Sequence, residues 1–264
     1  MQTGISTASL FGRMPTEDAV KFLSEKKVGC AEVFLESFCE YKDTFAEILK
    51  KVQNGLNVHS VHTLTTQFEP TLYSINERAK KDSFCLLEDT MRVAETLGAK
   101  YYTFHGGARF KKTPFKIDFE RVGAITREII AVTQAHGVSL AYENVHWGYY
   151  NYIGFFNQLK NRVPNLKGTF DIKQARQSNI PYSEFINEMG ADIVTAHLSD
   201  FRTDGKMCLP GKGETDFDEV FCRLRDVGFD GAVLIECYQN DFKETEELFE
   251  CLNYLENLSN KYFK

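Results

Sequence analysis

The sequence lacks the marks of a disulfide framework, a thiolate metal site and a membrane protein. Its seven cysteines are odd in number and irregularly spaced, and no Cys-x-x-Cys occurs, which is typical of reduced thiols in a cytosolic protein. No apolar run approaches the roughly 18 residues of a membrane span, and the first residues lack the basic-then-apolar pattern of a signal peptide. We therefore expect a cytoplasmic protein with no membrane partner.

Positive charge is also scarce. The chain has 31 Lys and Arg against 37 Asp and Glu, so its formal net charge is −6. Because nucleic-acid binding depends on Lys and Arg that neutralise phosphates, we expect no nucleic-acid partner. Hydrophobic residues make up 43% of the 264 residues, which is enough to bury the core of one domain over residues 1–264. A length of about 250 residues is usual for an eight-stranded α/β barrel.

Short apolar runs alternate with amphipathic runs along the whole chain. Strands are predicted at 3–6, 30–35, 56–64, 100–104, 138–142, 166–170, 193–198 and 232–235. Helices are predicted at 15–25, 41–52, 74–98, 119–135, 153–161, 182–189, 216–228 and 244–260, the sixth being irregular near Pro181. Alternation of this kind implies a parallel sheet.

Eight such units most simply close into a single (β/α)8 TIM barrel of the α/β class. The alternative is a doubly wound open sheet, which would carry a glycine-rich first βα turn for a nucleotide. The first turn here is Ala8-Ser9-Leu10-Phe11-Gly12, which does not fit that pattern and favours the barrel.

Metal-ligand residues stand at the ends of the last four predicted strands. They are Glu143, Asp171, His197 and Glu236. The carboxyl ends of barrel strands gather at one mouth, so we expect these side chains to meet there. Mixed imidazole and carboxylate sites suit Mn²⁺, Co²⁺, Zn²⁺ or Fe²⁺. Glu32, inside an earlier strand, is interpreted as a polar anchor under this site or as an ion-pair partner within the barrel.

The remaining strand and loop histidines divide between the site and the scaffold. His59 and His62 differ by three positions, so they are expected on opposite faces of a strand. We assign His62 to the site and His59 to packed core or surface. His105 in His-Gly-Gly contacts either substrate or backbone. His146 and Trp147 follow the fifth strand, and each is interpreted either as a substrate contact or as ordinary loop structure.

These motifs resemble the xylose isomerase-like TIM-barrel superfamily of sugar (phosphate) isomerases and epimerases, which includes tagatose 3-epimerase and endonuclease IV. The resemblance covers nearly the whole chain. It is carried by His105-Gly106-Gly107, Tyr142-Glu143-Asn144, Phe170-Asp171-Ile172, His197-Leu198-Ser199-Asp200, Pro210-Gly211-Lys212-Gly213 and Ile235-Glu236. It implies that one divalent metal ion (Mn²⁺, Co²⁺, Zn²⁺ or Mg²⁺) is held by Glu143, Asp171, His197 and Glu236. A homo-oligomer is expected by similarity only.

The function implied by the resemblance is that of an isomerase or epimerase in carbohydrate metabolism. Its substrate would be a small sugar, sugar phosphate or polyol-derived ketose. Abstracting a proton next to a carbonyl needs a base on one face of the carbon, and epimerisation needs a second acid/base on the other. Glu143 and Glu236 would be these catalytic groups, acting through a metal-stabilised enediolate. Asp171 and His197 would be mainly ligands.

Three further residues are predicted to contact substrate. Gln174 stands where the family often has His, and its amide can hydrogen-bond a sugar hydroxyl although it is a poor metal ligand. Arg202 lies close to where epimerases place a substrate-binding Arg. Lys212, between two glycines, either contacts a phosphate or carboxylate or is a surface lysine.

Three alternative functions use the same barrel. One is an inosose-type dehydratase, a lyase that would expel a β-hydroxyl from the same site. Another is an endonuclease IV-like zinc phosphodiesterase, which needs further histidines, including an Asp-x-His in the loop after the seventh strand. That loop contains Asp200 and Asp204 but no histidine, which weakens this hypothesis. The third is a binding barrel without turnover.

Overall fold

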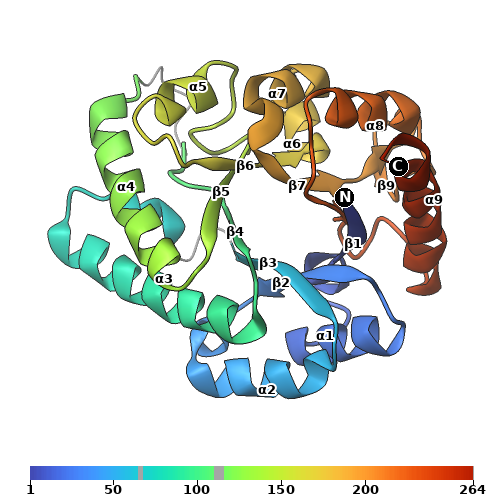
Figure 1. Ribbon diagram of the computed structural model, residues 1–264, viewed down its shortest axis with the longest axis horizontal. Coiled ribbons are helices and arrows are strands. Elements are labelled where there is room, and N and C mark those ends of the chain that lie inside the picture. The colour runs from blue at the N-terminus through green and yellow to red at the C-terminus, as the bar shows by residue number, and fades with distance from the viewer. Residues whose placement is uncertain (65–67, 110–115, 264) are drawn as a thin grey trace.

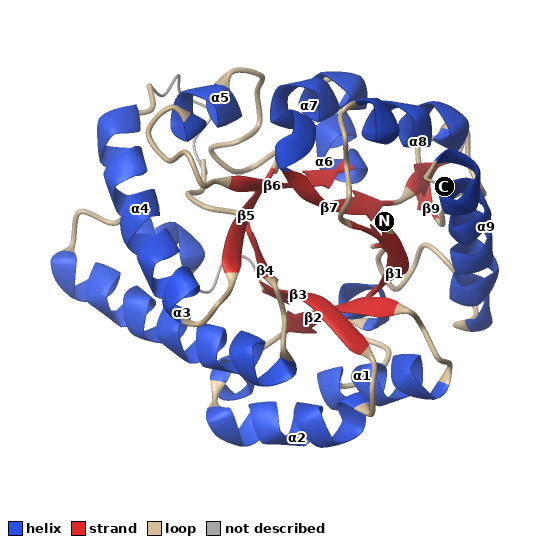
Figure 2. Cartoon of the chain, in the orientation of Figure 1, coloured by secondary structure: helices blue, strands red, loops and turns tan. Residues whose placement is uncertain are grey.

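Eight parallel strands close into one barrel surrounded by helices, as Figures 1 and 2 show. The computed structural model describes residues 1–64, 68–109 and 116–263. Around the barrel the strands follow the order β1-β10-β7-β6-β5-β4-β3-β2. The predicted (β/α)8 barrel is confirmed.

The barrel strands agree with the predicted ones to within a few residues. They are β1 Gln2–Ser6, β2 Cys30–Leu35, β3 Asn57–Thr63, β4 Tyr101–Phe104, β5 Ser139–Glu143, β6 Lys167–Asp171, β7 Ile193–Leu198 and β10 Ala232–Ile235. The loop after β7 contains a small antiparallel pair, β8 Asp200–Phe201 and β9 Met207–Cys208, which was not predicted.

The helices cover the outside of the barrel. They are α1 Thr16–Glu25, α2 Asp43–Gln53, α3 Glu77–Leu97, α4 Phe119–Ala135, α5 Phe155–Lys160, α6 Ile172–Gln177, α7 Tyr182–Met189, α8 Phe217–Asp226 and α9 Glu246–Tyr262. Short 3-10 helices are η1 Thr7–Leu10, η2 Phe38–Tyr41, η3 Glu69–Tyr73 and η4 Gly190–Asp192. None of the described helices has both the length and the apolar character needed to cross a lipid bilayer.

The short helix α6 was not predicted, and it matters for the site. The side chain of Asp171 at the end of β6 accepts the backbone N–H of Gln174 at 2.8 Å. This is an N-cap contact, which starts a helix directly after the strand. Because α6 begins at the barrel mouth, its first-turn residues Lys173 and Gln174 are buried there rather than exposed in a loop.

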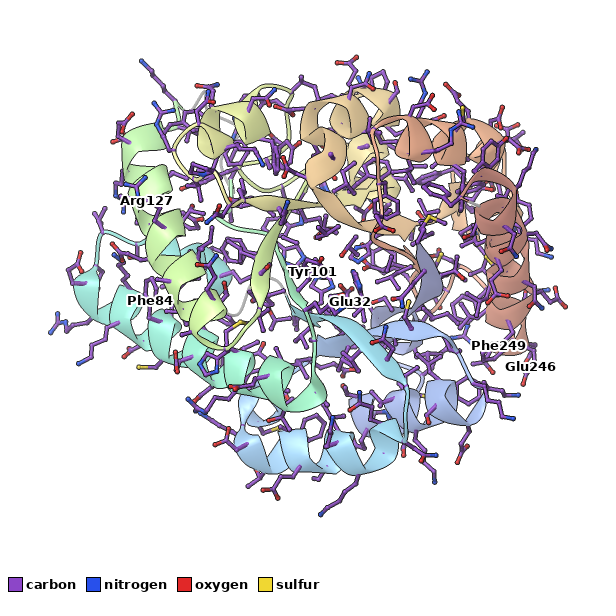
Figure 3. All side chains as sticks on the ribbon, in the orientation of Figure 1. Glu32, Phe84, Tyr101, Arg127, Glu246 and Phe249 are labelled. Atoms are coloured by element: carbon purple, nitrogen blue, oxygen red, sulfur yellow. The ribbon has the colours of Figure 1, made fainter. Side chains whose placement is uncertain are left out.

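The inside of the barrel is apolar at one end and polar at the other. Cys30, Ala232 and Leu234 form a small apolar cluster of their own within the barrel. Farther along the same strands stand Glu32 and Glu236. Figure 3 shows Glu32 within the ring of strands, whereas Phe84 and Arg127 lie on the outer helices. The carboxyl ends of the strands therefore hold the polar groups, as in other barrels of this class.

A buried carboxylate fixes the loop after β7. Asp200 is fully buried. Its Oδ1 accepts the backbone N–H groups of Phe201 (2.7 Å) and Thr215 (3.0 Å), and its Oδ2 accepts those of Gly211 (3.1 Å) and Gly213 (2.8 Å). A Cβ on Gly213 would lie 2.5 Å from Asp200 Oδ1, so only glycine fits this contact. Asp200 thus holds the ends of the loop together.

We expect Asp200→Asn to lower the free energy of unfolding by about 2–4 kcal/mol, since the new amide NH2 group would face backbone N–H groups that donate to Asp200 in the native protein. Urea unfolding followed by circular dichroism measures the change. Asp204→Asn is the matched control, because Asp204 is an exposed aspartate of the same loop with one backbone contact, to Lys206 at 3.0 Å. Equal losses of unfolding free energy in the two variants would contradict the role of Asp200 in holding the ends of the loop together.

Candidate active site

Four polar side chains from consecutive strand ends meet at the barrel mouth. The Nδ1 atom of His197 lies 3.5 Å from Glu143 Oε1, 3.9 Å from Asp171 Oδ2 and 2.9 Å from Glu236 Oε2. All four residues are buried. The structure thus brings together the residues that the sequence assigned to one metal site, from β5, β6 and β7 and from the residue after β10.

The arrangement of these atoms suits a cation. Among the described residues, no hydrogen-bond partner with suitable geometry exists for Glu143 Oε2, Asp171 Oδ2, Glu236 Oε2 or either ring nitrogen of His197. Several of them lie at ion-pairing distance, but not at a hydrogen-bonding angle. Buried polar atoms normally have partners. One ligand atom each from Glu143, Asp171 and His197 lies within 4.8 Å of the others, so these residues fit a divalent metal ion with nitrogen and oxygen ligands.

Glu32 anchors two of the imidazoles from below. Its Oε1 lies 3.2 Å from His62 Nδ1 and 3.0 Å from His197 Nε2. Three hydroxyl groups also donate to it, those of Ser6 at 3.1 Å, Ser60 at 2.7 Å and Thr103 at 2.6 Å. Burial opposes the charge of Glu32, but His197 and His62 outweigh it and hold the pKa of Glu32 well below its usual range. Of the two interpretations of Glu32, the anchor is the one that the geometry favours.

A second buried carboxylate, Glu69, orients the third imidazole. Its Oε2 accepts the backbone N–H of His105 and lies 2.9 Å from His105 Nδ1. The Nε2 atom of His105 then lies 2.8 Å from His62 Nε2 and 3.2 Å from Glu143 Oε2. Carboxylates that hold imidazoles in this way fix the ring orientation. The sequence did not point to Glu69, because it belongs to no periodic pattern and stands at the start of η3, a short 3-10 helix that was not predicted.

Lys173 is a second residue of the candidate site that the sequence did not identify. Its Nζ lies 3.0 Å from Glu236 Oε1 and 3.6 Å from Asp171 Oδ2. The only signal was its place two residues after Asp171, and that signal needed the unpredicted helix α6 to have meaning.

The two carboxylates nearest His197 have opposite pKa shifts. Burial raises the pKa of Glu143 to about 7, against the opposing effects of His197 and His105. Burial acts in the same direction on Glu236, but the charges of His197 and Lys173 outweigh it and hold the pKa of Glu236 well below its usual range. Environments that separate two carboxylates in this way are typical of acid/base pairs.

A cavity of about 240 Å³ opens above these groups. Its walls are largely apolar, from Phe11, Phe34, Leu64, Trp147 and Tyr238. The polar residues that line it are His62, His105, Glu143, Lys173, Gln174 and Glu236. A few polar groups converging under apolar walls are what a small-molecule site needs.

The predicted substrate-contact residues fall into two groups. His62, His105, Trp147 and Gln174 line the cavity. His146 is exposed and outside the cavity lining, with its Nδ1 2.7 Å from the side-chain oxygen of Gln174.

The two predicted cationic contacts are not brought to the cavity. Arg202 is exposed in the β8–β9 turn, and Lys212 is exposed with its Nζ 3.5 Å from Glu250 Oε2. Neither of them lines the cavity.

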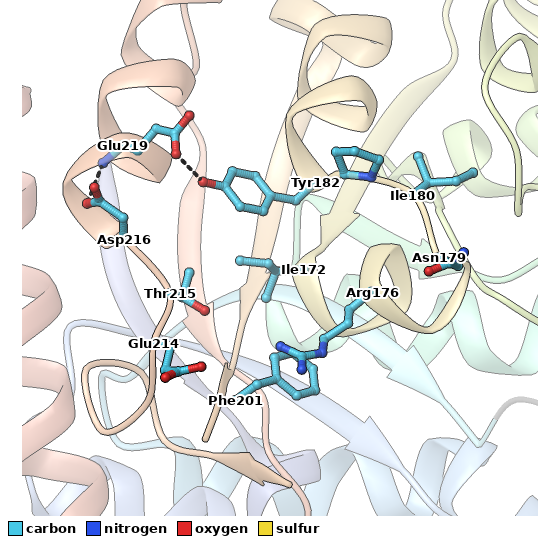
Figure 4. A pocket seen from close by; sticks show the side chains of 11 residues that line it. Ile172, Arg176, Asn179, Ile180, Tyr182, Phe201, Glu214, Thr215, Asp216 and Glu219 are labelled. Atoms are coloured by element: carbon cyan, nitrogen blue, oxygen red, sulfur yellow. Dashed lines mark hydrogen bonds between the residues drawn. The ribbon is translucent and has the colours of Figure 1, made fainter. Parts of the chain in front are cut away.

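A larger hollow of about 610 Å³ lies outside the barrel, between α6, α7 and the start of α8 (Figure 4). Arg176, Tyr182, Phe201 and Glu219 are among its lining residues, and the hydroxyl of Tyr182 donates to Glu219 at 2.8 Å. None of the buried imidazoles or carboxylates of the barrel mouth lines this hollow, so the smaller internal cavity is the candidate active site.

The structure corrects the expectation that His59 and His62 point to opposite faces. The β2–β3 pairing shifts register, so that Ala31 pairs with Val58 and Glu32 with Ser60. This irregularity breaks the strict alternation of side chains along the strand. His59 therefore also points into the barrel, where its Nε2 lies 3.1 Å from the carbonyl oxygen of Val194 on β7, across the barrel. It does not line the cavity and belongs to the packed core.

The chain belongs to the xylose isomerase-like TIM barrel family, whose profile matches residues 20–257. A protein of Methanocaldococcus jannaschii without an assigned function is 24% identical over 217 residues, covering 76% of this chain and 71% of that protein.

Two solved structures illustrate the likeness in fold. The D-psicose 3-epimerase of Clostridium cellulolyticum H10, solved with D-tagatose, is 18% identical, with a TM-score of 0.76 and complete coverage of both chains. The IolI protein, solved with a zinc atom, is also 18% identical, with a TM-score of 0.79 and complete coverage of both chains. At these identities the likeness shows the fold.

We expect buried His59 to make the protein less stable in mild acid. Burial lowers the pKa of His59 to about 4, whereas an unfolded histidine titrates near about 6.5. As the pH falls from 6.5, the unfolded chain binds a proton that the folded one does not, so folding becomes less favourable. Relative to His59→Gln, the wild type should lose about 2–3 kcal/mol of unfolding free energy between pH 7 and pH 4.5.

Urea unfolding of both proteins at the two pH values measures this difference. His136→Gln is a control of opposite sign. Burial of His136 is outweighed by Glu95 and Glu88, which raise its pKa, so its contribution is present at low pH and is lost as the pH rises. If the free energy of unfolding depended on pH in the same way in the wild type and in His59→Gln, the lowered pKa of His59 in the folded protein would be contradicted.

Proposed function

We propose that the protein is a metal-dependent isomerase or epimerase of a small ketose. The observation that carries this proposal is that Glu143 and Glu236, from non-adjacent barrel strands, both line the cavity and lie 3.5 Å and 2.9 Å from the same atom, His197 Nδ1. Two carboxylates facing one substrate carbon can remove a proton from one face and return it to the other. The likeness to structures of sugar epimerases supports the same reaction class.

The roles of the residues follow from their positions. Glu143, Asp171, His197 and Glu236 would hold one divalent ion, which when bound supplies Lewis-acid stabilisation of the negative charge that develops next to the carbonyl. Glu236 stays ionised because the charges of His197 and Lys173 lower its pKa, and its carboxylate takes the proton from carbon. Glu143, whose pKa burial raises, returns it on the opposite face.

The other cavity residues bind and shield the substrate. His62 and His105, each oriented by a buried carboxylate, face sugar hydroxyls. Gln174 is held by His146 and can donate its amide N–H groups to another hydroxyl. Trp147 and Phe34 supply apolar walls that keep water from the reacting carbon.

The nuclease hypothesis has less support than the isomerase. Both side-chain oxygens of Asp200 accept backbone N–H groups, so this carboxylate is committed to the loop rather than to a second or third metal ion. Among the described residues, the lysine that lines the cavity is Lys173, and it is paired with carboxylates. The described part of the lining therefore offers a phosphodiester no lysine without a carboxylate partner.

In heavy water, we expect the wild type to exchange the hydrogen on the carbon next to the carbonyl of its substrate for deuterium. D-Tagatose, D-fructose and a ketose phosphate are suitable probes, followed by NMR. Glu143→Gln and Glu236→Gln should each lower the exchange rate by about 100-fold or more, the usual contribution of a general acid or base. Glu184→Gln, on the exposed surface of α7, is the matched control.

Release of water together with a new unsaturated carbonyl would instead identify a dehydratase. Exchange at the parent rate in Glu236→Gln would remove Glu236 from its proposed role.

Metal analysis of protein purified without chelator should give about one divalent ion per chain, because the four strand-end residues make up one set of ligands of the usual size. The control is Asp171→Asn, which removes one ligand charge and should lower the metal content. Two or three zinc ions per chain would favour the phosphodiesterase, and no metal after supplementation with Mn²⁺ and Zn²⁺ would contradict the proposal.

A further inference from the structure

A lysine ammonium group is buried among the residues proposed to hold the metal ion. Lys173 is only 2% exposed. Its Nζ lies 3.0 Å from Glu236 Oε1 and 3.6 Å from Asp171 Oδ2, and it stands over the ring of Tyr238 at 4.7 Å. Burying an ammonium is costly unless opposite charges and hydrogen bonds compensate for it. The partners that compensate here are two of the four proposed metal ligands.

The position of Lys173 is fixed by the backbone rather than by a flexible loop. The side chain of Asp171 caps α6, and Lys173 is the second residue of that helix. Asn144 also holds the backbone of Asp171, donating to its carbonyl oxygen at 2.9 Å and accepting its N–H at 2.8 Å. The backbone from which the Lys173 side chain extends into the site is therefore held in place.

One carboxylate oxygen faces both the lysine and the centre of the site. Asp171 Oδ2 lies 3.6 Å from Lys173 Nζ and 3.9 Å from His197 Nδ1. Glu236 divides its oxygens, with Oε1 facing Lys173 and Oε2 facing His197. A divalent ion held by these ligands would stand close to a positive charge that uses the same carboxylates.

We propose that Lys173 is an internal cation that competes with the divalent ion for Asp171 and Glu236, and so lowers the affinity of the site for metal. This inference rests on the proposed metal site. Without the ion, the ammonium holds the two carboxylates near each other. With the ion, the two cations repel, and at separations of a few ångström inside a protein this repulsion is substantial.

A purely structural role for Lys173 predicts the opposite result. If the lysine only held the ligands in place, its removal would loosen the site and weaken metal binding. If it competes, its removal strengthens metal binding. The direction of the change in metal affinity therefore separates the two roles, independently of any catalytic assay.

The experiment measures the dissociation constants of Mn²⁺ and Zn²⁺, each added alone to chelator-treated protein in competition with a fluorescent chelator. Lys173→Met should bind each ion at least about tenfold more tightly than the wild type, which corresponds to about 1.4 kcal/mol. Lys173→Gln keeps a donor for Glu236 without the charge and should change affinity in the same direction. Lys173→Arg keeps the charge and should stay near the wild type.

Lys167→Met is the matched control. Lys167 is also paired with a carboxylate, Asp192 at 3.0 Å, but stands at the start of β6, so its loss should leave metal affinity unchanged. Thermal unfolding gives a second readout, in which added Mn²⁺ should raise the melting temperature of Lys173→Met by more than that of the wild type. If Lys173→Met does not fold without metal, Lys173→Gln carries the same test.

The outcomes distinguish this inference from the proposed function. Unchanged or weaker metal binding in both neutral variants would overturn the competition and leave the isomerase proposal standing. Tighter binding in these variants together with a wild type that exchanges no substrate proton would support the competition and contradict the isomerase. If no variant binds either ion, the competition is overturned together with the metal site.

Discussion

The buried carboxylate of Glu32 is the contact on which the arrangement of the site depends. It joins β2 to four other strands, because its partners are Ser6 on β1, Ser60 and His62 on β3, Thr103 on β4 and His197 on β7. A carboxylate without such partners could not remain ionised inside a barrel. With them, it holds two imidazoles in fixed orientations, so that Nε2 of His62 faces His105 and Nδ1 of His197 faces Glu236.

Charge compensation extends outward from this anchor. Glu69 orients His105 as Glu32 orients His62, and the ring nitrogens of the two histidines meet at 2.8 Å. The carboxylates of Asp171 and Glu236 face Lys173 and His197. Networks of this kind are costly when one member lacks a partner. Glu143 Oε2, Asp171 Oδ2, Glu236 Oε2 and His197 Nδ1 have no hydrogen-bond partner of suitable geometry among the described residues. They come from the four residues that meet at the barrel mouth, which is why we infer a metal site rather than a structural ion-pair network.

Much of the site could be predicted because strand ends in a barrel have a known meeting place. Glu143, Asp171, His197 and Glu236 each follow a short apolar run, and alternation of strands and helices is enough to place all four at one mouth. His59 belongs to the packed core, as predicted, but the face of the strand on which it lies was misjudged. The alternation argument assumes a regular strand, and the register shift beside Ser60 leaves no mark in the sequence. Glu69 and Lys173 were missed because both stand in short helices, η3 and α6, that were not predicted.

The sequence by itself determined the order of the elements, the barrel and the residues at its strand ends, because these depend on local periodicity and on a closure rule shared by all such barrels. Only the tertiary structure decided which charges face one another. The pairing of Lys173 with Glu236 joins residues 63 positions apart, and that of His197 with Glu32 brings two distant strands together. Such contacts depend on distances across the barrel interior, and these distances cannot be predicted from the spacing of residues along the chain.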